Sequence, residues 1–179
     1  MSETRWRLAI HGGAGSTRMA HSDQQDRTAR AGLERALAAG SEILEKRERA
    51  IDAVEAAVRV LEEDSCFNAG RGSVLTASGC IELDAAIMDG MDRAAGAVAG
   101  LRTTRAPISL ARLILDEGQH VFLSGKGADG FARDHGLEQV ENSWFEVPER
   151  RRQLEELVAA GGFDDEIKYG TVGAVAVDV

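Results

Sequence analysis

The chain ends in a run of small and β-branched residues, Tyr169–Val179, and this run constrains the fold more than any other stretch. Only two glycines and Asp178 interrupt the sequence that follows Tyr169. Closely spaced Val and Ala are typical of a strand that is buried on both faces, because the side chains of both faces are then apolar. The sequence therefore predicts a core β-strand at this position.

The strand is entered through a Gly170-Thr171 step, whose two residue types can support chemistry. A threonine at a chain terminus has its own base, because a free α-amino group with a pKa of about 8 can take the hydroxyl proton. Glycine tolerates strained backbone conformations, so the Thr171 hydroxyl could attack the Gly170 carbonyl and shift the acyl group from nitrogen to oxygen. Hydrolysis of that ester would free Thr171. The same pair also suits an ordinary turn before a strand.

Length and charge limit the classes of protein. A chain of 179 residues with 44% hydrophobic residues suits one globular domain with a sizeable core. The formal net charge is −9, and the one basic cluster, Arg150–Arg152, falls in an otherwise acidic predicted helix. We therefore expect no nucleic acid as a partner.

Neither targeting nor disulfide chemistry is indicated. No stretch approaches the roughly 18 apolar residues that span a membrane, and the amino-terminal residues lack the apolar segment of a signal peptide. We expect no membrane partner and a cytoplasmic location. The two cysteines, Cys66 and Cys80, have no partner spacing typical of zinc sites, so buried free thiols are expected.

Hydrophobic spacing predicts a mixture of helices and strands. The expected helices cover about 22–45, with Ser22-Asp23 as the N-cap, 49–63, a segment that begins at Pro107 and a segment from Pro148 to the glycines at 161–162. The expected strands cover 8–10, 74–76, 81–88, 95–100 and 121–123, with Asp89-Gly90 as a hairpin turn. A polar connector, 163–169, precedes the final strand.

Two glycine-containing segments could present backbone groups to a ligand. The cluster His11–Gly15 can offer several N–H groups to an anion or a carbonyl, or can form a tight turn that keeps two elements close. Loop 63–73 must turn back on itself, and its inward-facing carbonyls could hold a monovalent cation, while Asn68 could point into an adjacent cleft. Composition alone favours a compact Ω-like loop tied by its own side chains.

The segment Gly125–Gly130 matches GxGxxG after a predicted strand. A dinucleotide fingerprint belongs to the first strand-helix turn of a doubly wound unit, with an acidic residue at the end of a second strand. This segment lies two-thirds of the way along the chain, and the next apolar strand has no such ending. A nucleotide-binding module is therefore not expected.

Taken together, five ordered segments resemble the asparaginase family of N-terminal nucleophile hydrolases, which includes plant-type asparaginases, isoaspartyl peptidases and glycosylasparaginases. Their order and spacing agree over essentially the whole chain. The segments are Ile10–Gly15, Leu61-Glu62-Glu63 with Phe67–Gly72, Glu82–Gly90, Ala95–Gly100 and Gly170–Ala176.

The resemblance implies an α+β fold, a four-layer αββα sandwich made as an inactive precursor. Residues 1–170 would be the α subunit portion, and residues 171–179 would begin a β subunit whose remainder is absent from this sequence. Cleavage between Gly170 and Thr171 would create the nucleophile. Thr171 would then attack L-asparagine or a β-aspartyl dipeptide, and water would hydrolyse the resulting ester to release L-aspartate. Asn68 matches a family asparagine near the nucleophile.

The resemblance also implies a sodium ion and further partners, but no organic cofactor. The sodium ion would be held by main-chain oxygens of Leu61, Glu62, Asp64, Phe67, Ala69 and Arg71. The chain would associate with its own β subunit and form a dimer of αβ units. The ranking of asparagine, β-aspartyl peptides and glycosylated asparagine stays open, although the lack of a signal peptide favours the first two. A different hypothesis is a non-catalytic truncated fragment that acts only as a folding or binding partner.

Overall fold

The computed structural model describes residues 6–13, 23–161 and 170–179. Part of the predicted glycine cluster (Ala14 and Gly15), the predicted N-cap at Ser22 and the predicted connector 163–169 lie outside the described residues. None of the helices in the described ranges combines the length and hydrophobicity needed to cross a membrane.

Two long helices form a closely packed pair. Helix α1 (Asp23–Glu45) and helix α2 (Ala50–Glu63) confirm the two helices expected from hydrophobic spacing. The buried stripe of α1 contains Gly32, Ala36 and Gly40 at intervals of four residues, so it presents a narrow surface to its neighbour. A Cβ on Gly40 would lie 2.9 Å from the Ala53 carbonyl oxygen. Small side chains therefore set how closely α1 and α2 approach.

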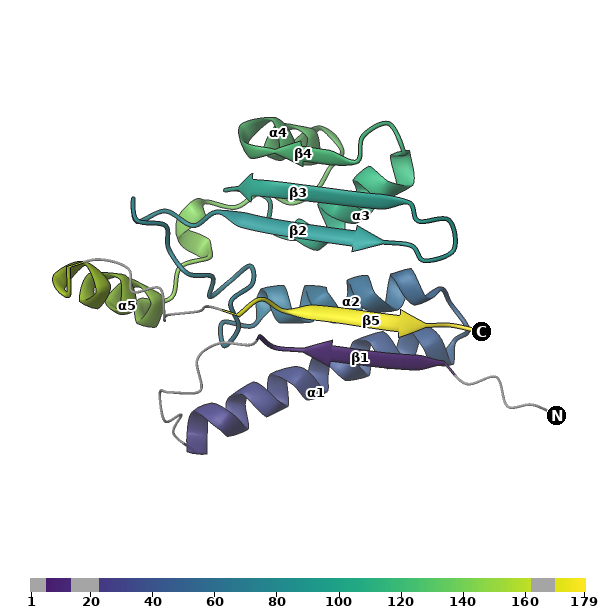
Figure 1. Ribbon diagram of the computed structural model, residues 1–179, viewed down its shortest axis with the longest axis horizontal. Helices are drawn as coiled ribbons and strands as arrows, with labels where there is room; N and C mark the ends of the chain where they lie inside the picture. Colours follow the sequence, from purple (N-terminus) through teal and green to yellow (C-terminus); the bar gives the residue numbers. More distant parts are fainter. Residues whose placement is uncertain (1–5, 14–22, 162–169) are drawn as a thin grey trace.

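Five strands form two sheets. Strand β1 (Arg7–His11) pairs antiparallel with β5 (Gly173–Val177). Strand β2 (Leu83–Met88) pairs antiparallel with β3 (Ala95–Leu101), and β3 pairs parallel with β4 (Phe122–Ser124). Figure 1 shows the two sheets side by side, with β5 and β2 as neighbouring edges. Each sheet therefore ends at a strand that faces the other.

Helices cover one side of the strands. Helices α1 and α2 pack against β1 and β5, while α3 (Pro107–Glu117) packs against β2 and β3 (Figure 1). As predicted, Pro107 and Pro148 stand in the first turns of α3 and α5 (Pro148–Ala159). The remaining elements are α4 (Gly125–Asp134) and a short 3₁₀ helix (Asn142–Trp144). This mixture is consistent with the expected α+β class, and the four-layer sandwich stays a prediction.

The larger hydrophobic core lies between β2, β3 and their helices. Leu101, Leu110 and Phe145 are completely buried there. Gly96 brings β3 close to α3, since a Cβ on Gly96 would lie 2.0 Å from the Ala111 carbonyl oxygen. A smaller cluster of buried residues, Ala36, Leu61 and Phe67, joins α1, α2 and the following loop.

Two predictions about strands are wrong. Residues 74–76 form no strand, because the Thr76 N–H donates to Cys80 and the Thr76 carbonyl accepts from Gly79 within a local turn. Strand β5 is not buried on both faces, since the side chains of Val175 and Val177 are 64% and 61% exposed. Within the described ranges β5 pairs only with β1 and packs against α2, which leaves its other face uncovered.

The expectation for the cysteines is partly wrong. Both thiols are free, but Cys66 is exposed and Cys80 is only partly buried. Cys66 lies in the loop after α2, where its backbone N–H donates to the Asp64 carboxylate at 3.0 Å. That bond closes a tight turn, which holds the Cys66 side chain outside the core.

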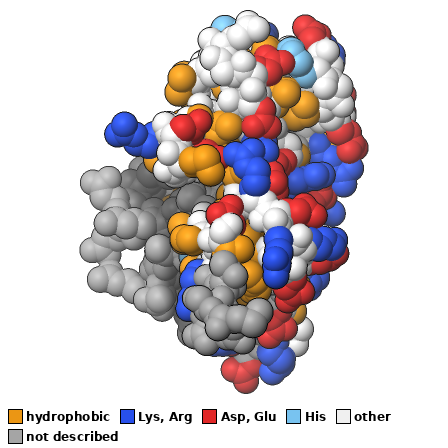
Figure 2. Space-filling view, turned by 90° about the vertical axis from the view of Figure 1, so that its right-hand side faces the viewer, with side chains coloured by type: hydrophobic (Ala, Val, Ile, Leu, Met, Phe, Trp, Pro, Cys, Tyr) orange, Lys and Arg blue, Asp and Glu red, His pale blue; other side chains and the backbone are white. Residues whose placement is uncertain are grey.

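Charges of both signs share the surface. Figure 2 shows Lys and Arg side chains interleaved with Asp and Glu side chains along one side of the displayed face. Typical pairs are Arg152 with Glu149 and Glu156, all on α5. The one basic cluster of the sequence is thus partly neutralised within its own helix.

Candidate functional site

A cavity of about 920 Å³ lies between the neighbouring edges of β5 and β2. Residues 171–176 line one side and residues 82–90 line the other. Ile51, Val54 and Val58 of α2 contribute an apolar part of the lining. Its volume is in the range of small-molecule sites. Asn68 and Thr171 both belong to the lining, so the cavity brings together the two residues that the sequence marks for catalysis.

The side chain of Asn68 bridges the loop and the Gly170-Thr171 step. Its Nδ2 donates to the Gly170 carbonyl oxygen at 3.0 Å, although the two residues are 102 positions apart. Its Oδ1 accepts from the backbone N–H of Val74 at 2.9 Å. Because an N–H can only donate, Val74 requires the amide oxygen on its side and leaves the amide N–H groups for Gly170. Asn68 thus donates to the carbonyl of the peptide bond at which cleavage is expected.

The described part of the glycine cluster packs against the same place. Gly13 has φ +117°, and a Cβ on it would lie 3.4 Å from the Gly170 carbonyl carbon. A Cβ on Gly12 would lie 2.6 Å from the Phe67 ring. These contacts favour the tight-turn interpretation of the cluster over the anion site, because the glycines let β1 and the Asn68 loop approach closely.

The loop after α2 folds back on the end of that helix. Gly70 has φ +46°, and a Cβ there would lie 2.3 Å from the Glu62 carbonyl oxygen. The next N–H, that of Arg71, donates to the same oxygen at 2.7 Å. The loop is also tied by side chains, as the Ω-like interpretation predicts, through Asp64 to the Cys66 N–H and Asn68 to the Val74 N–H. Asn68 is therefore held by a locally rigid loop.

Glu62 places a buried carboxyl group in the cavity wall. Its Oε1 accepts from the Ile108 N–H at 2.9 Å, while Oε2 is buried without a hydrogen-bond partner in the described ranges. Burial raises the pKa of this carboxyl to about 8, because the charged form loses its hydration and the Ile108 bond offsets only part of that loss. Glu62 is therefore mainly protonated at neutral pH.

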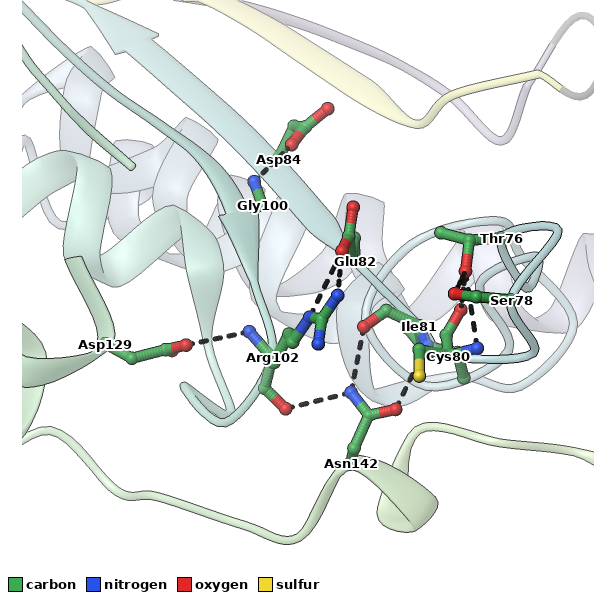
Figure 3. Close-up of polar contacts among 10 residues, drawn as sticks. All are labelled: Thr76, Ser78, Cys80, Ile81, Glu82, Asp84, Gly100, Arg102, Asp129 and Asn142. Carbon is green, nitrogen blue, oxygen red and sulfur yellow. Dashed lines mark hydrogen bonds and ion pairs between the residues drawn. The ribbon is translucent and has the colours of Figure 1, made fainter. Parts of the chain in front are cut away.

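A polar network holds the wall of the cavity that contains β2. Figure 3 shows the Arg102 side chain directed at Glu82, which lines the cavity, and the Arg102 N–H directed at Asp129. The Asn142 side chain connects Ile81 to the Arg102 carbonyl (Figure 3). The beginning of β2 is thus fixed to the end of β3.

The GxGxxG segment belongs to the same polar network. Residues 125–130 form the first part of α4, and the buried Asp129 carboxylate accepts from the backbone N–H groups of Arg102, Thr103 and Thr104. Its remaining contact is the Thr104 hydroxyl at 2.7 Å. Asp129 therefore caps the connection between β3 and α3. Sequence spacing does not reveal this role, because the donors lie 25–27 residues upstream.

Two further contacts of the Asn68 loop come from Phe145 and Arg150, which no motif in the sequence connects to the site. The Gly72 N–H donates to the Phe145 carbonyl at 2.8 Å, and the Gly72 carbonyl accepts from Arg150 Nε at 2.8 Å. Arg150 stands out in the sequence only as part of a basic cluster. No local pattern connects it to a loop 78 residues away.

Comparisons with known proteins identify a family for the chain. The family model described as asparaginase matches residues 4–179. Three similar proteins are "Probable isoaspartyl peptidase/L-asparaginase 2" of Arabidopsis thaliana, "Isoaspartyl peptidase/L-asparaginase" of Mus musculus and "Isoaspartyl peptidase" of Escherichia coli (strain K12). They are 42%, 43% and 41% identical to the chain over 97%, 96% and 96% of its length.

The matched region covers only part of each relative: 54% of the Arabidopsis protein, 52% of the mouse protein and 57% of the Escherichia coli protein. The chain thus spans little more than half the length of these relatives. The family match nevertheless extends over nearly the whole chain and includes both Asn68 and the Gly170-Thr171 step. On this basis the chain belongs to the asparaginase family.

Proposed function

We propose that the full-length polypeptide containing this chain is a threonine-nucleophile hydrolase that cuts its own chain between Gly170 and Thr171 and then cleaves L-asparagine, β-aspartyl dipeptides or both. The observation that carries the proposal is the hydrogen bond from Asn68 Nδ2 to the Gly170 carbonyl oxygen. A donor at this oxygen polarises the peptide bond whose cleavage makes Thr171 an N-terminal residue.

The proposed self-cleavage has two steps. The Thr171 hydroxyl oxygen attacks the Gly170 carbonyl carbon, the C–N bond breaks, and the hydroxyl proton passes to the departing nitrogen, so that an ester replaces the amide. Negative charge develops on the Gly170 oxygen during the attack, and the Asn68 N–H stabilises it. Water then hydrolyses the ester, which leaves a carboxylate on Gly170 and a free α-amine on Thr171.

The freed Thr171 supplies both nucleophile and base for the second reaction. Its α-amine takes the hydroxyl proton, and the hydroxyl oxygen attacks the side-chain carbonyl of asparagine or the β-carbonyl of a β-aspartyl dipeptide. Ammonia or the amine of the second residue leaves with the proton that the α-ammonium returns to it, and water then releases L-aspartate from the ester and restores the Thr171 hydroxyl. This chemistry needs no organic cofactor. The cavity of about 920 Å³ beside Thr171 has room for such a substrate. Relatives named isoaspartyl peptidase/L-asparaginase support the choice of substrates.

The proposal includes a β subunit that begins at Thr171, with residues 1–170 forming the α portion. Two observations support a further segment over β5. Val175 and Val177 expose apolar side chains, and the curated relatives are nearly twice as long as the matched region. We propose that the rest of the polypeptide covers this face of β5, and that two such αβ units pair in the active enzyme.

The proposed sodium ion is consistent with the chemistry of the loop after α2. Hard cations prefer oxygen ligands, and the carbonyls of Leu61 and Glu62 stand in the last turn of a helix, the end that carries partial negative charge. The Glu62 carbonyl accepts one N–H and keeps a second lone pair. With Asp64, Phe67, Ala69 and Arg71, these residues would hold the ion and thereby stiffen the loop that contains Asn68.

The test compares the full-length polypeptide with Thr171→Ala. We expect the parent protein to yield a fragment that begins at Thr171, detected by mass spectrometry, and to release aspartate from asparagine or a β-aspartyl dipeptide. Thr171→Ala should abolish both events, because no other group supplies the hydroxyl. Thr28→Ala is the matched control and should behave like the parent, since Thr28 is an exposed residue of α1 whose hydroxyl donates to the Gln24 carbonyl.

Two outcomes would contradict the proposal. A Thr171→Ala protein that still hydrolyses β-aspartyl peptides would exclude Thr171 as the nucleophile. A parent chain that stays permanently intact and inactive would favour the other hypothesis, a non-catalytic folding or binding partner.

A further inference from the structure

Gly72 is held on both sides by the segment that begins α5. Its N–H donates to the Phe145 carbonyl at 2.8 Å, and its carbonyl accepts from Arg150 Nε at 2.8 Å. The Arg150 guanidinium is itself oriented by Gln153, whose Oε1 accepts from it at 2.9 Å. A guanidinium bond to a carbonyl is charge-assisted and therefore stronger than a bond between neutral groups. Arg150 thus fixes one residue of the Asn68 loop from outside the loop.

Position 72 requires glycine. Gly72 has φ +99°, a region that side chains rarely adopt, and a Cβ there would lie 2.5 Å from the Ser65 oxygen and 2.9 Å from the Phe67 oxygen. Residue 72 therefore has no room for a side chain on the side of Ser65 and Phe67, and its carbonyl is bonded to Arg150.

Two residues after Gly72, the Val74 N–H determines how the Asn68 amide is turned. A continuous series of contacts therefore runs from Arg150 to Gly72, along the backbone to Val74, and through the Asn68 side chain to the Gly170 carbonyl oxygen. If Gly72 moved, the Val74 N–H would move with it, and the Asn68 amide would lose the contact that orients its N–H groups toward Gly170.

We propose that Arg150 is a positioning residue for self-cleavage, which it serves by holding Gly72 and thereby orienting Asn68 toward the Gly170 carbonyl. The inference rests on the proposed self-cleavage and extends it to a residue that touches none of the reacting atoms. Misplacing a catalytic group by about 1 Å can slow a reaction by about 100-fold. Loss of Arg150 should therefore slow cleavage strongly while Asn68 and Thr171 are both still present.

The test measures, in the full-length polypeptide, the rate at which the fragment beginning at Thr171 forms from freshly made precursor. We expect Arg150→Ala to slow this rate by about 10- to 100-fold and Arg150→Lys to slow it less, because lysine keeps a cationic donor without the planar fork. Arg152→Ala is the matched control. Arg152 lies on the same helix and pairs with Glu149 and Glu156 of that helix, so its removal should change the rate less than twofold.

Three further measurements distinguish positioning from general stabilisation of α5. If Arg150 acts through Asn68, the double variant Asn68→Ala/Arg150→Ala should cleave no more slowly than Asn68→Ala alone. Hydroxylamine, which cleaves esters, should not restore cleavage of Arg150→Ala, because the defect precedes ester formation. The melting temperature of Arg150→Lys should match that of the parent.

The outcomes separate the inference from the function on which it rests. A parent protein that never cleaves contradicts the proposed function, whatever Arg150 does. A parent that cleaves, together with an Arg150→Ala protein that cleaves at the same rate, overturns the role of Arg150. So does a slow Arg150→Ala whose effect adds to that of Asn68→Ala or is relieved by hydroxylamine. If Arg150→Ala does not fold, Arg150→Lys and its double variant with Asn68→Ala decide the question.

Discussion

The half of the molecule built on β2, β3 and β4 contains the larger hydrophobic core, whereas in the half built on β1 and β5 the last strand keeps one face uncovered within the described ranges. Exposed apolar side chains also occur in the first half, at Met88 of β2 and Phe122 of β4. In the first half, Leu101, Leu110 and Phe145 are fully buried between the sheet and its helices. In the second half, β5 has an equally apolar sequence, yet Val175 and Val177 are mostly exposed. The difference shows that an apolar strand sequence indicates that the strand can be buried. Whether it is buried depends on which other segments pack against it.

Polar groups follow the same division. In the first half, Asp129 is buried and accepts backbone N–H groups, so it serves the fold. In the second half, Asn68 donates to a peptide carbonyl at the start of the uncovered strand. The Asp129 contacts thus stabilise the connection between β3 and α3 beside the larger core. The Asn68 contact instead reaches the peptide bond of the proposed cleavage, at the start of β5.

Breaking the packing of the larger core should have the largest effect. A Cβ on Gly96 would lie 2.0 Å from the Ala111 oxygen and 2.7 Å from the Leu115 nitrogen, and both are backbone atoms of α3 that cannot yield separately. We expect Gly96→Ala to lower the free energy of unfolding in urea by about 3 kcal/mol or more. Gly90→Ala, which would meet nothing within 4 Å, should change it by less than about 0.5 kcal/mol. Equal effects of the two substitutions would contradict this account of the β3–α3 contact.

Removing the Asp129 carboxylate should have the next largest effect. Burial alone would raise the pKa of Asp129, but hydrogen bonds from residues 102–104 outweigh it and lower the pKa below its usual value. Asp129→Asn should cost about 2 kcal/mol at neutral pH, because an amide N–H group would face backbone N–H groups. Asp134→Asn, an exposed residue of the same helix, is the control and should cost less than about 0.5 kcal/mol.

The pH dependence gives the sign of the Asp129 contribution. A carboxyl group whose pKa is lower in the folded than in the unfolded state stabilises the fold above the unfolded pKa of about 3.9, and this contribution is lost as the pH falls through the folded pKa. The difference in unfolding free energy between the parent and Asp129→Asn should therefore shrink in acid. A difference that stays constant from neutral pH to about pH 2 would show that the charge of Asp129 is not involved.

The uncovered face of β5 can be tested with two valines of nearly equal exposure. Val175 on β5 is 64% exposed and Val121, next to β4, is 65% exposed. If the rest of the polypeptide covers β5, Val175→Thr should destabilise the full-length protein by about 1 kcal/mol, since a hydroxyl replaces a buried methyl group. Val121→Thr should cost less than about 0.5 kcal/mol. Equal costs, measured by urea unfolding, would mean that β5 stays as open as β4.

Local patterns predicted the elements whose structure is set by near neighbours. The apolar spacing of α1 and α2 and the prolines that begin α3 and α5 correspond to what the structure shows. Residues 74–76 were mispredicted because β-propensity does not reveal that Thr76 bonds within a turn. The exposure of β5 does not follow from its residue pattern, because periodicity reports the side chains of a strand and not its neighbours.

Distant contacts explain the rest of the site. Asn68 and Gly170 could be connected only through the family resemblance, since they are 102 residues apart. The roles of Arg150 and Asp129 depend on backbone groups that have no characteristic sequence, so no motif marks them. The backbone partner of each side chain distinguishes the two roles: Asp129 accepts from N–H groups after β3, whereas Asn68 donates to the Gly170 carbonyl.

The pairing of β1 with β5 determines what the proposed cut would do to the molecule. The two strands lie on opposite sides of the Gly170-Thr171 bond in the sequence, yet they are joined in register from Arg7 opposite Val177 to His11 opposite Gly173. Cleavage of that bond would therefore give two polypeptides that stay associated through the backbone hydrogen bonds between β1 and β5. The protein would show two bands on a denaturing gel while it sedimented under native conditions with the mass of the uncut form.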